Sequence, residues 1–124
     1  MIGYVTLGTN DLARAAKFYD AICSELGVGR MFDTETFIAW GKPGGGAGIG
    51  LTKPYDGNAA TVGNGVMVAL ECKDKDQVDR VYNLAIAMGA KCEGPAGPRE
   101  GIPGFYAGYF RDPDGNKLNA FIMG

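Results

Sequence analysis

The sequence is poor in residues that carry out chemistry. It contains no histidine among its 124 residues, which excludes Ser–His and Cys–His nucleophile pairs and removes a common ligand of transition metals. For acid–base chemistry the plausible group is Glu71, at the end of a predicted strand. Burial beside Met67 and aromatic residues would let it abstract a proton. A solvated ion pair with Lys73 or Lys75 is the alternative interpretation.

Two glycine-rich segments give weaker evidence of a binding site. Arg99 and Glu100 lie in the glycine- and proline-rich segment 94–104, where Arg99 could bind an anionic ligand; a solvated loop is the alternative. The run Gly44-Gly45-Gly46 lacks the downstream lysine and the helix start of a phosphate-binding loop. We therefore predict no nucleotide site.

Charge and hydropathy narrow the range of partners. The net charge is −2, from 12 basic and 14 acidic residues, and the lysines and arginines are scattered along the sequence. This pattern argues against nucleic acid and against an anionic membrane surface. No apolar run approaches the ~20 residues of a membrane span. The amino terminus has no cleavable leader pattern, and the cysteine number is odd, so we expect a cytoplasmic protein with reduced thiols at Cys23, Cys72 and Cys92.

The chain contains an internal repeat. Adding 63 to four positions in the first half gives the same residue types in the second half: Val5 and Val68, Leu7 and Leu70, Asp11 and Asp74, Tyr19 and Tyr82. An offset of half the chain indicates two similar modules, whose faces can pair around a cleft that would hold a ligand. We predict a single domain over 1–124, with module one at about 1–53, a connector at 54–64 and module two at about 65–124.

Each module is predicted to run strand, helix and three strands, which is an α+β design. An oxygen side chain at Asp11 can cap the first helix, and Gly27 can end it in the left-handed conformation. Asp74 can cap the second helix in the way that Asp11 caps the first. Period-2 alternation and turn residues place the strands near 2–8, 30–33, 36–41, 47–52, 65–72, 90–93, 105–111 and 117–122.

Two segments resemble the vicinal oxygen chelate superfamily, the group of glyoxalase I, bleomycin resistance proteins and extradiol dioxygenases. The first is residues 4–12 followed by Phe18-Tyr19, and the second is residues 110–118, which contain the turn Asp112-Pro113-Asp114-Gly115. The resemblance covers essentially the whole chain. It implies that two βαβββ modules form a curved mixed sheet or half-barrel around a central pocket.

The resemblance also places the metal site of that family on this chain. Its enzymes hold a divalent metal with a histidine in the first strand of each module and a glutamate in the last strand. These positions fall on Tyr4, Met67 and Asn119, and an optional fourth ligand falls near Gly48 or Gly50. A phenol, a thioether and a carboxamide are poor ligands for such metals. We therefore expect no metal and no cofactor.

Strand alternation indicates which residues line the implied pocket. The residues expected to face it are Tyr4, Thr6, Met67, Ala69, Glu71, Phe105, Ala107, Tyr109, Asn119 and Phe121, with Trp40 from the third strand. The predicted ligand-binding residues are Tyr4, Trp40, Met67, Tyr109, Asn119 and Arg99. Such a lining suits a flat or apolar small molecule. Alternatively, Tyr4, Met67 and Phe121 fill the former metal cavity, and Trp40 forms a surface lid or dimer contact.

The leading hypothesis is a metal-free binding protein, similar to glyoxalases and bleomycin resistance proteins, that takes up a small amphipathic or aromatic molecule. The resemblance implies a homodimer, with no nucleic acid or membrane partner. The alternative is a lyase or isomerase of the superfamily, either metal-free, using Glu71 or Tyr4, or with an unusual metal site. A third hypothesis is a scaffold whose pocket has closed.

Overall fold

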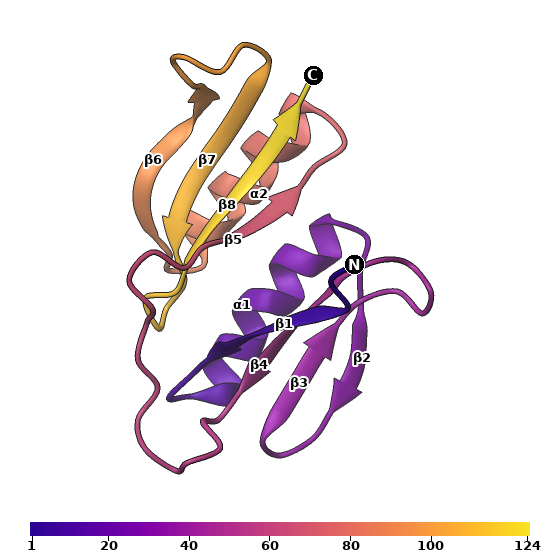
Figure 1. The fold of residues 1–124 in the computed structure, drawn as a ribbon, viewed down its shortest axis with the longest axis vertical. Coiled ribbons are helices and arrows are strands. Elements are labelled where there is room, and N and C mark those ends of the chain that lie inside the picture. The colour runs from indigo at the N-terminus through magenta and orange to yellow at the C-terminus, as the bar shows by residue number, and fades with distance from the viewer. The chain divides into compact units, whose positions relative to one another are not determined.

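A computed structural model describes the whole chain, residues 1–124. The chain forms two compact units, which we call unit 1 (Met1–Val62) and unit 2 (Gly63–Gly124). Each unit runs strand, helix and three strands (Figure 1), and each is described by itself below. The predicted α+β class and the pair of βαβββ modules are confirmed.

Unit 1 combines one helix with a mixed sheet. Its elements are β1 (Tyr4–Gly8), α1 (Leu12–Glu25), β2 (Arg30–Asp33), β3 (Phe37–Trp40) and β4 (Gly48–Thr52). The four strands are ordered β1-β4-β3-β2. β1 pairs with β4 in parallel, whereas the other neighbours are antiparallel. In this register Tyr4 lies opposite Gly48, and Ala39 lies opposite Gly50.

Unit 2 repeats this topology, and its last three strands are longer than those of unit 1. Its elements are β5 (Val68–Glu71), α2 (Lys75–Ala87), β6 (Lys91–Pro98), β7 (Phe105–Arg111) and β8 (Lys117–Met123). The strand order is β5-β8-β7-β6, with β5 and β8 parallel. Tyr109 lies opposite Asn119, and Arg111 lies opposite Lys117. Both sheets are open and mixed, as the sequence predicts.

The two helices begin and end in the same way. Asp11 accepts a hydrogen bond from the Arg14 amide at 3.1 Å, and Asp74 accepts one from the Gln77 amide at 2.7 Å. These side chains satisfy amide groups that have no partner within the helix. Gly27 and Gly89 follow the two helices with φ of 76° and 102°, the left-handed conformation that ends many helices. The predicted N-caps and the glycine stop after α1 are confirmed.

Each sheet buries one face against its own helix. In unit 1 this layer is filled by large rings, because Phe18 and Tyr19 of α1 and Trp40 of β3 are almost fully buried. In unit 2 small residues occupy much of the corresponding layer. There Gly108 allows a close approach, since a Cβ atom at this position would lie 2.8 Å from Cδ1 of Tyr82. Leu7, Leu118 and Ala120, which alternate with residues predicted to face the pocket, are buried.

One strand differs from the prediction. β6 runs from Lys91 to Pro98, whereas the sequence suggested a strand near 90–93 followed by a loop. Glycine and proline normally interrupt strands, but an edge strand tolerates them where no amide is needed for pairing. β6 is an edge strand, and its register shifts twice along β7.

The segment between the units is attached to unit 1. The Asn10 carboxamide donates to the Ala60 carbonyl at 3.2 Å and accepts from the Ala60 amide at 2.7 Å. These two bonds imitate a backbone pairing and fix residue 60 against the loop before α1. Neither helix has the length and apolar character that crossing a membrane requires.

Candidate functional site

The candidate site lies on the sheet faces that carry no helix. We call these the helix-free faces, and alternation of side chains along the strands defines them. In unit 1, Tyr4, Phe37, Ala39, Gly48 and Gly50 share this face, and the rings of Tyr4 and Phe37 meet edge to face with centroids 6.5 Å apart. Glycine at two of these positions leaves the sheet backbone uncovered.

A depression of about 370 Å³ lies on the helix-free face of unit 1. Aromatic, thioether and glycine residues form most of its lining, and no charged side chain contributes to it. The lining consists of Gly3, Tyr4, Met31, Phe32, Phe37, Ala39, Trp40, Gly46 and Gly48. Tyr4 is 66% exposed, Phe32 59% and Met31 46%. Large apolar side chains at such exposures mark a binding surface more often than a core.

Gly48 contributes to the floor of this depression. A Cβ atom at this position would come within 2.9 Å of the Trp40 carbonyl oxygen. Glycine in a strand interior often marks a place where another group approaches the backbone closely. A flat molecule could therefore lie against the peptide groups here.

The structure corrects the prediction for Trp40. Trp40 borders the depression, but its indole lies on the helix side of the sheet and only 1% of the residue is exposed. The ring packs against Tyr19 of α1 with centroids 5.7 Å apart, and Nε1 donates to Asp20 at 2.9 Å. Strand alternation from Phe37 gives this orientation, because residues 37 and 39 share one face and residues 38 and 40 share the other. Trp40 is therefore a core residue and not a stacking platform.

Sequence reasoning missed Met31, Phe32 and Phe37, which line the depression. A signal was present for Phe37, since the same alternation that places Ile38 against the helix places Phe37 beside Tyr4. For Met31 and Phe32 the signal was weak, because the pairing of β2 with β3 is irregular between Arg30 and Phe32. A register shift of this kind cannot be read from local alternation.

The helix-free face of unit 2 combines rings with polar groups. Phe105 and Phe121 stack with centroids 5.8 Å apart. Asn119 is only 2% exposed, and its Oδ1 is buried without a hydrogen-bond partner. A buried acceptor that forms no hydrogen bond costs about 1–3 kcal/mol. Asn119 is thus the polar group of this face that would gain most from a ligand.

Tyr109 and Arg99 lie beside Asn119 but are partly engaged by other groups. The Arg99 guanidinium carbon is 5.0 Å from the Tyr109 ring centroid, and Lys117 Nζ is 5.7 Å from it. Arg99 donates to four carbonyl oxygens of its own segment, those of Gly94, Pro95, Gly97 and Pro98. The predicted anion-binding residue Arg99 therefore uses most of its donors to hold β6, while its positive charge remains uncompensated.

Met67 and Glu71 mark the two ends of β5, and both are exposed. Met67 precedes the strand and is 40% exposed. Glu71 ends the strand and is also exposed. The hypothesis that Glu71 acts as a base requires burial among apolar residues, and this requirement is not met. The exposure agrees instead with the alternative of a solvated carboxylate.

The residues at the family's metal positions do not form a metal site. Tyr4 offers an exposed phenol, Met67 an exposed thioether and Asn119 a carboxamide. Nowhere in the chain do three Cys, Asp or Glu side chains gather in a way that could hold a metal ion. Transition metals in such sites need imidazole, thiolate or carboxylate donors. The donor set therefore does not fit the metal that this family's enzymes use.

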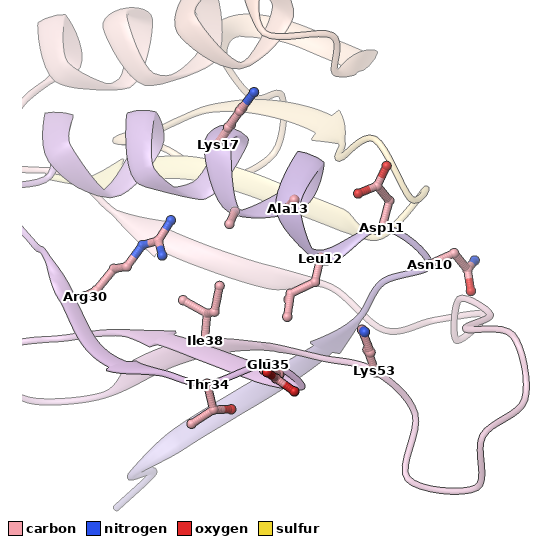
Figure 2. Close-up of a pocket in the computed structure, with 11 residues that line it drawn as sticks. Asn10, Asp11, Leu12, Ala13, Lys17, Arg30, Thr34, Glu35, Ile38 and Lys53 are labelled. Atoms are coloured by element: carbon pink, nitrogen blue, oxygen red, sulfur yellow. The ribbon is translucent and has the colours of Figure 1, made fainter.

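A larger groove lies on the helix side of unit 1. It measures about 690 Å³ and lies between the start of α1 and the β2–β3 hairpin. Figure 2 shows Leu12 and Ile38 pointing into this space, whereas Lys17 points away from the hairpin. Its charges are mixed, Asp11 caps α1, and Arg30 already bonds Asp20 and Asp33. Since Asp11 and Arg30 of this groove already serve the fold, we do not place the site there.

Comparisons with known proteins agree with this architecture. The family model described as Glyoxalase/Bleomycin resistance protein/Dioxygenase superfamily matches residues 1–120. A solved glyoxalase/bleomycin resistance protein from Albidiferax ferrireducens is 35% identical, with a TM-score of 0.90, and the match covers 100% of this chain and 99% of that one. No curated protein matches the chain.

Two more distant solved structures share the fold. A glyoxalase/bleomycin resistance protein/dioxygenase family enzyme from Burkholderia phytofirmans is 20% identical, with a TM-score of 0.76 and 98% of each chain covered. A lactoylglutathione lyase from Agrobacterium tumefaciens is 20% identical, with a TM-score of 0.70, covering 98% of this chain and 92% of that one. At these identities the likeness concerns the fold alone.

Proposed function

The chain belongs to the glyoxalase/bleomycin resistance protein/dioxygenase superfamily, and on this basis we propose that it binds a small amphipathic or aromatic molecule without a catalytic metal. The observation that carries the proposal is the depression of about 370 Å³ on the helix-free face of unit 1, whose lining has no charged side chain. Its size falls within the range of small-molecule sites.

The chemistry of the lining supports a flat, π-rich ligand. Tyr4 and Phe37 present rings at an angle to each other, so a planar molecule could stack on one and contact the edge of the other. Met31 adds a polarizable sulfur, which contacts aromatic rings favourably. Aromatic contacts of this kind add about 0.5–1.5 kcal/mol each beyond the area that they bury.

The donor set supports binding over metal-dependent catalysis. A phenol, a thioether and a carboxamide at Tyr4, Met67 and Asn119 can contact an organic molecule but would hold a divalent cation weakly. In this proposal Tyr4 contacts the ligand within unit 1, and Asn119 offers a contact within unit 2 only. Met67 lies next to β5 as an apolar contact.

We also propose a homodimer in a reducing compartment, the cytoplasm. Ile2, Tyr4, Met31 and Phe32 expose large apolar side chains in unit 1, and a second copy of the chain would remove part of this surface from water. All three cysteines are free thiols. Light scattering during size-exclusion chromatography measures the molar mass and so tests the dimer directly. A monomer mass at a chain concentration of about 100 μM would exclude the dimer.

The binding proposal is tested with a neutral aromatic probe, 2-naphthol, by isothermal titration calorimetry. We expect Tyr4→Ala to weaken binding by about tenfold, which corresponds to about 1.4 kcal/mol. The matched control is Tyr55→Ala, because Tyr55 is fully exposed and lies outside the depression. Equal affinities of both variants and the wild type would contradict the proposed site.

The proposal that the chain binds no catalytic metal is tested separately, by thermal unfolding with Zn²⁺, Ni²⁺ or Mn²⁺. A ligand that binds only the folded state raises the unfolding temperature. We expect 2-naphthol to raise it and the three metal ions to leave it unchanged. A rise with one of these ions that a chelator reverses would establish a metal site and refute this part of the proposal.

A further inference from the structure

A row of basic side chains crosses the helix-free face of unit 2. Lys91 of β6 lies opposite Arg111 of β7, which in turn lies opposite Lys117 of β8. Residues directly opposite each other in antiparallel strands project from the same face. Arg111 and Lys117 flank the turn between β7 and β8, and Lys91 lies on the other side of β7, so lysines and arginines that look scattered along the chain form a cluster in space.

This cationic row is compensated at Arg111 but not at Lys91 or Lys117. Arg111 pairs with Glu93, and its Nη1 donates to the Gly115 carbonyl at 3.1 Å. Glu93 accepts a hydrogen bond from Arg111 Nε at 2.8 Å, and this bond, followed by the charges of Arg111, Lys117 and Lys91, lowers the pKa of Glu93. Lys91 and Lys117 form no ion pair. Like charges directly opposite in a sheet are destabilising. Such a row in a protein of net charge −2 is unexpected if the face serves the fold alone.

Asp112 of the neighbouring turn is engaged within that turn. Asp112 is 4% exposed, and its Oδ1 accepts hydrogen bonds from the amides of Asp114 and Asn116, each at 2.9 Å. Its Oδ2 accepts from Asn116 Nδ2 at 3.0 Å. These bonds hold the turn between β7 and β8, so Asp112 faces into the turn and away from a ligand.

A second observation on the same face points to a ligand. Asn119 follows Lys117 by two residues, about 7 Å along the strand, and its buried Oδ1 has no hydrogen-bond partner. Its cross-strand neighbour Tyr109 lies under the uncompensated charges of Arg99 and Lys117. Two cations and an unsatisfied acceptor are therefore close together on one surface.

We propose that this face of unit 2 binds a small anion, a carboxylate or phosphate that carries a hydroxyl or N–H donor a few bonds away. The anion lies at Lys117, where a charge-assisted hydrogen bond holds it, because Arg111 is already engaged by Glu93 and Gly115. The donor reaches Oδ1 of Asn119 and supplies its missing partner. The inference goes beyond the proposed function, because it assigns unit 2 a site of its own.

The experiment uses glycolate and acetate, two carboxylates that differ in a hydroxyl group, and follows the backbone amide signals of the full chain by NMR titration. We expect glycolate to shift the signals of β7 and β8 and to bind about fivefold more tightly than acetate, because only glycolate bonds to Asn119. Inorganic phosphate, as a third probe, should shift the same signals if phosphate is also accepted. Binding of each should weaken as ionic strength rises.

Two variants separate the two contacts. Lys117→Gln should weaken glycolate and acetate alike, and the matched control Lys53→Gln, an exposed lysine of unit 1, should change neither. Asn119→Leu keeps the side-chain volume and should abolish the preference for glycolate while sparing acetate. Equal binding of the two carboxylates to the wild-type chain, or shifts centred on unit 1, would overturn the inference even if a variant fails to fold.

The test also distinguishes this inference from the proposed function. Lys117→Gln should leave the affinity for 2-naphthol unchanged, because the depression in unit 1 has no charged side chain. If 2-naphthol fails to bind while glycolate binds as expected, the aromatic site is refuted and the anion site stands. If 2-naphthol binds and glycolate does not, the anion site is refuted.

Discussion

The two units have the same topology but differ in their helix-free faces. Unit 1 presents an aromatic depression without charged side chains, whereas unit 2 presents a row of basic residues beside a buried carboxamide. On the helix sides the units are alike in one respect, because an aromatic strand residue donates to a helix aspartate in each. Trp40 bonds Asp20, and Tyr106 bonds Asp79 at 2.6 Å. Packing against the helix constrains one face, and the other face is free to acquire different chemistry.

The helix sides differ in how the layer is filled. Unit 1 uses the rings of Phe18, Tyr19 and Trp40, whereas unit 2 buries one large ring, Phe110, among aliphatic and small residues, with a close approach of Tyr82 to Gly108. Both helix–sheet layers must be densely packed, so a change of side-chain volume in either layer should destabilise the fold. The following predictions test whether this contrast holds.

The largest effect is expected from Trp40→Ala. Removal of a fully buried ring should lower the free energy of unfolding by about 4 kcal/mol, measured by chemical denaturation. Tyr4→Ala, on the helix-free face of the same unit, should cost less than about 0.5 kcal/mol, because Tyr4 is largely exposed. Similar losses for the two variants would contradict the assignment of Trp40 to the core and Tyr4 to a binding surface.

Gly108→Ala tests the small-residue layer of unit 2. The added Cβ atom would lie 3.1 Å from Cβ of Tyr82 as well as close to its ring, so a rotation of the ring alone does not relieve the contact. We expect a loss of about 2 kcal/mol. In a Tyr82→Ala background the same change should cost little, and a double-mutant cycle measures this coupling. Additive losses would show that Tyr82 is not the obstacle.

Asp20→Asn tests the ion pair that attaches β2 to α1. Hydrogen bonds from Arg30 are the largest cause that lowers the pKa of Asp20. A lowered pKa stabilises the fold above the unfolded-state value of about 3.9, and this stabilisation is lost as the pH falls through the folded-state pKa. Both side chains are more than a third exposed, so after allowance for solvent screening we expect about 1 kcal/mol at pH 7.

The pH dependence of the stability difference between wild type and Asp20→Asn shows whether charge causes that difference. Denaturation of wild type and Asp20→Asn should give converging stabilities below about pH 4, because protonated aspartate no longer forms the ion pair. Asp33→Asn is the control, since Asp33 is the more exposed partner of Arg30 and should contribute less. A constant difference between pH 7 and pH 3 would indicate packing and not charge.

The smallest expected effect is a difference in reactivity among the thiols, and it involves no change in stability. Burial raises the pKa of Cys23 in unit 1 to about 12, so at pH 8 it holds on the order of a thousandfold less thiolate than an ordinary thiol. Cys92 in unit 2 is exposed. A disulfide reagent should therefore modify one thiol rapidly in the folded chain and all three after denaturation. Cys92→Ser should remove the rapid phase, and its persistence would contradict the assignment.

The sequence predicts most of the fold because local signals agree with packing. Asp11, Asp74 and Gly27 mark helix ends through hydrogen bonds and backbone conformation that depend on near neighbours only. Strand alternation likewise separates Leu118 and Ala120 from Asn119. Where such signals conflict, as in the glycines and prolines of β6, the prediction ends the strand too early.

The candidate site is less predictable because it depends on pairing between distant strands. The row of Lys91, Arg111 and Lys117 exists only in the register of three strands, and no local pattern in the sequence reveals it. Glu71 depends on burial, which alternation alone does not give. Tyr4 and Asn119 were predicted because the family resemblance marked their positions. Phe37 carries no such mark, and only strand alternation could have placed it beside Tyr4.

The Arg99 contacts have a consequence for self-association. An uncovered sheet edge can recruit strands from other molecules and start fibril growth. β6 has few free backbone groups with which such a strand could pair. Pro95 and Pro98 lack amide donors, and Arg99 donates to the carbonyl oxygens of residues 94, 95, 97 and 98. One arginine thus shields an outer strand against aggregation.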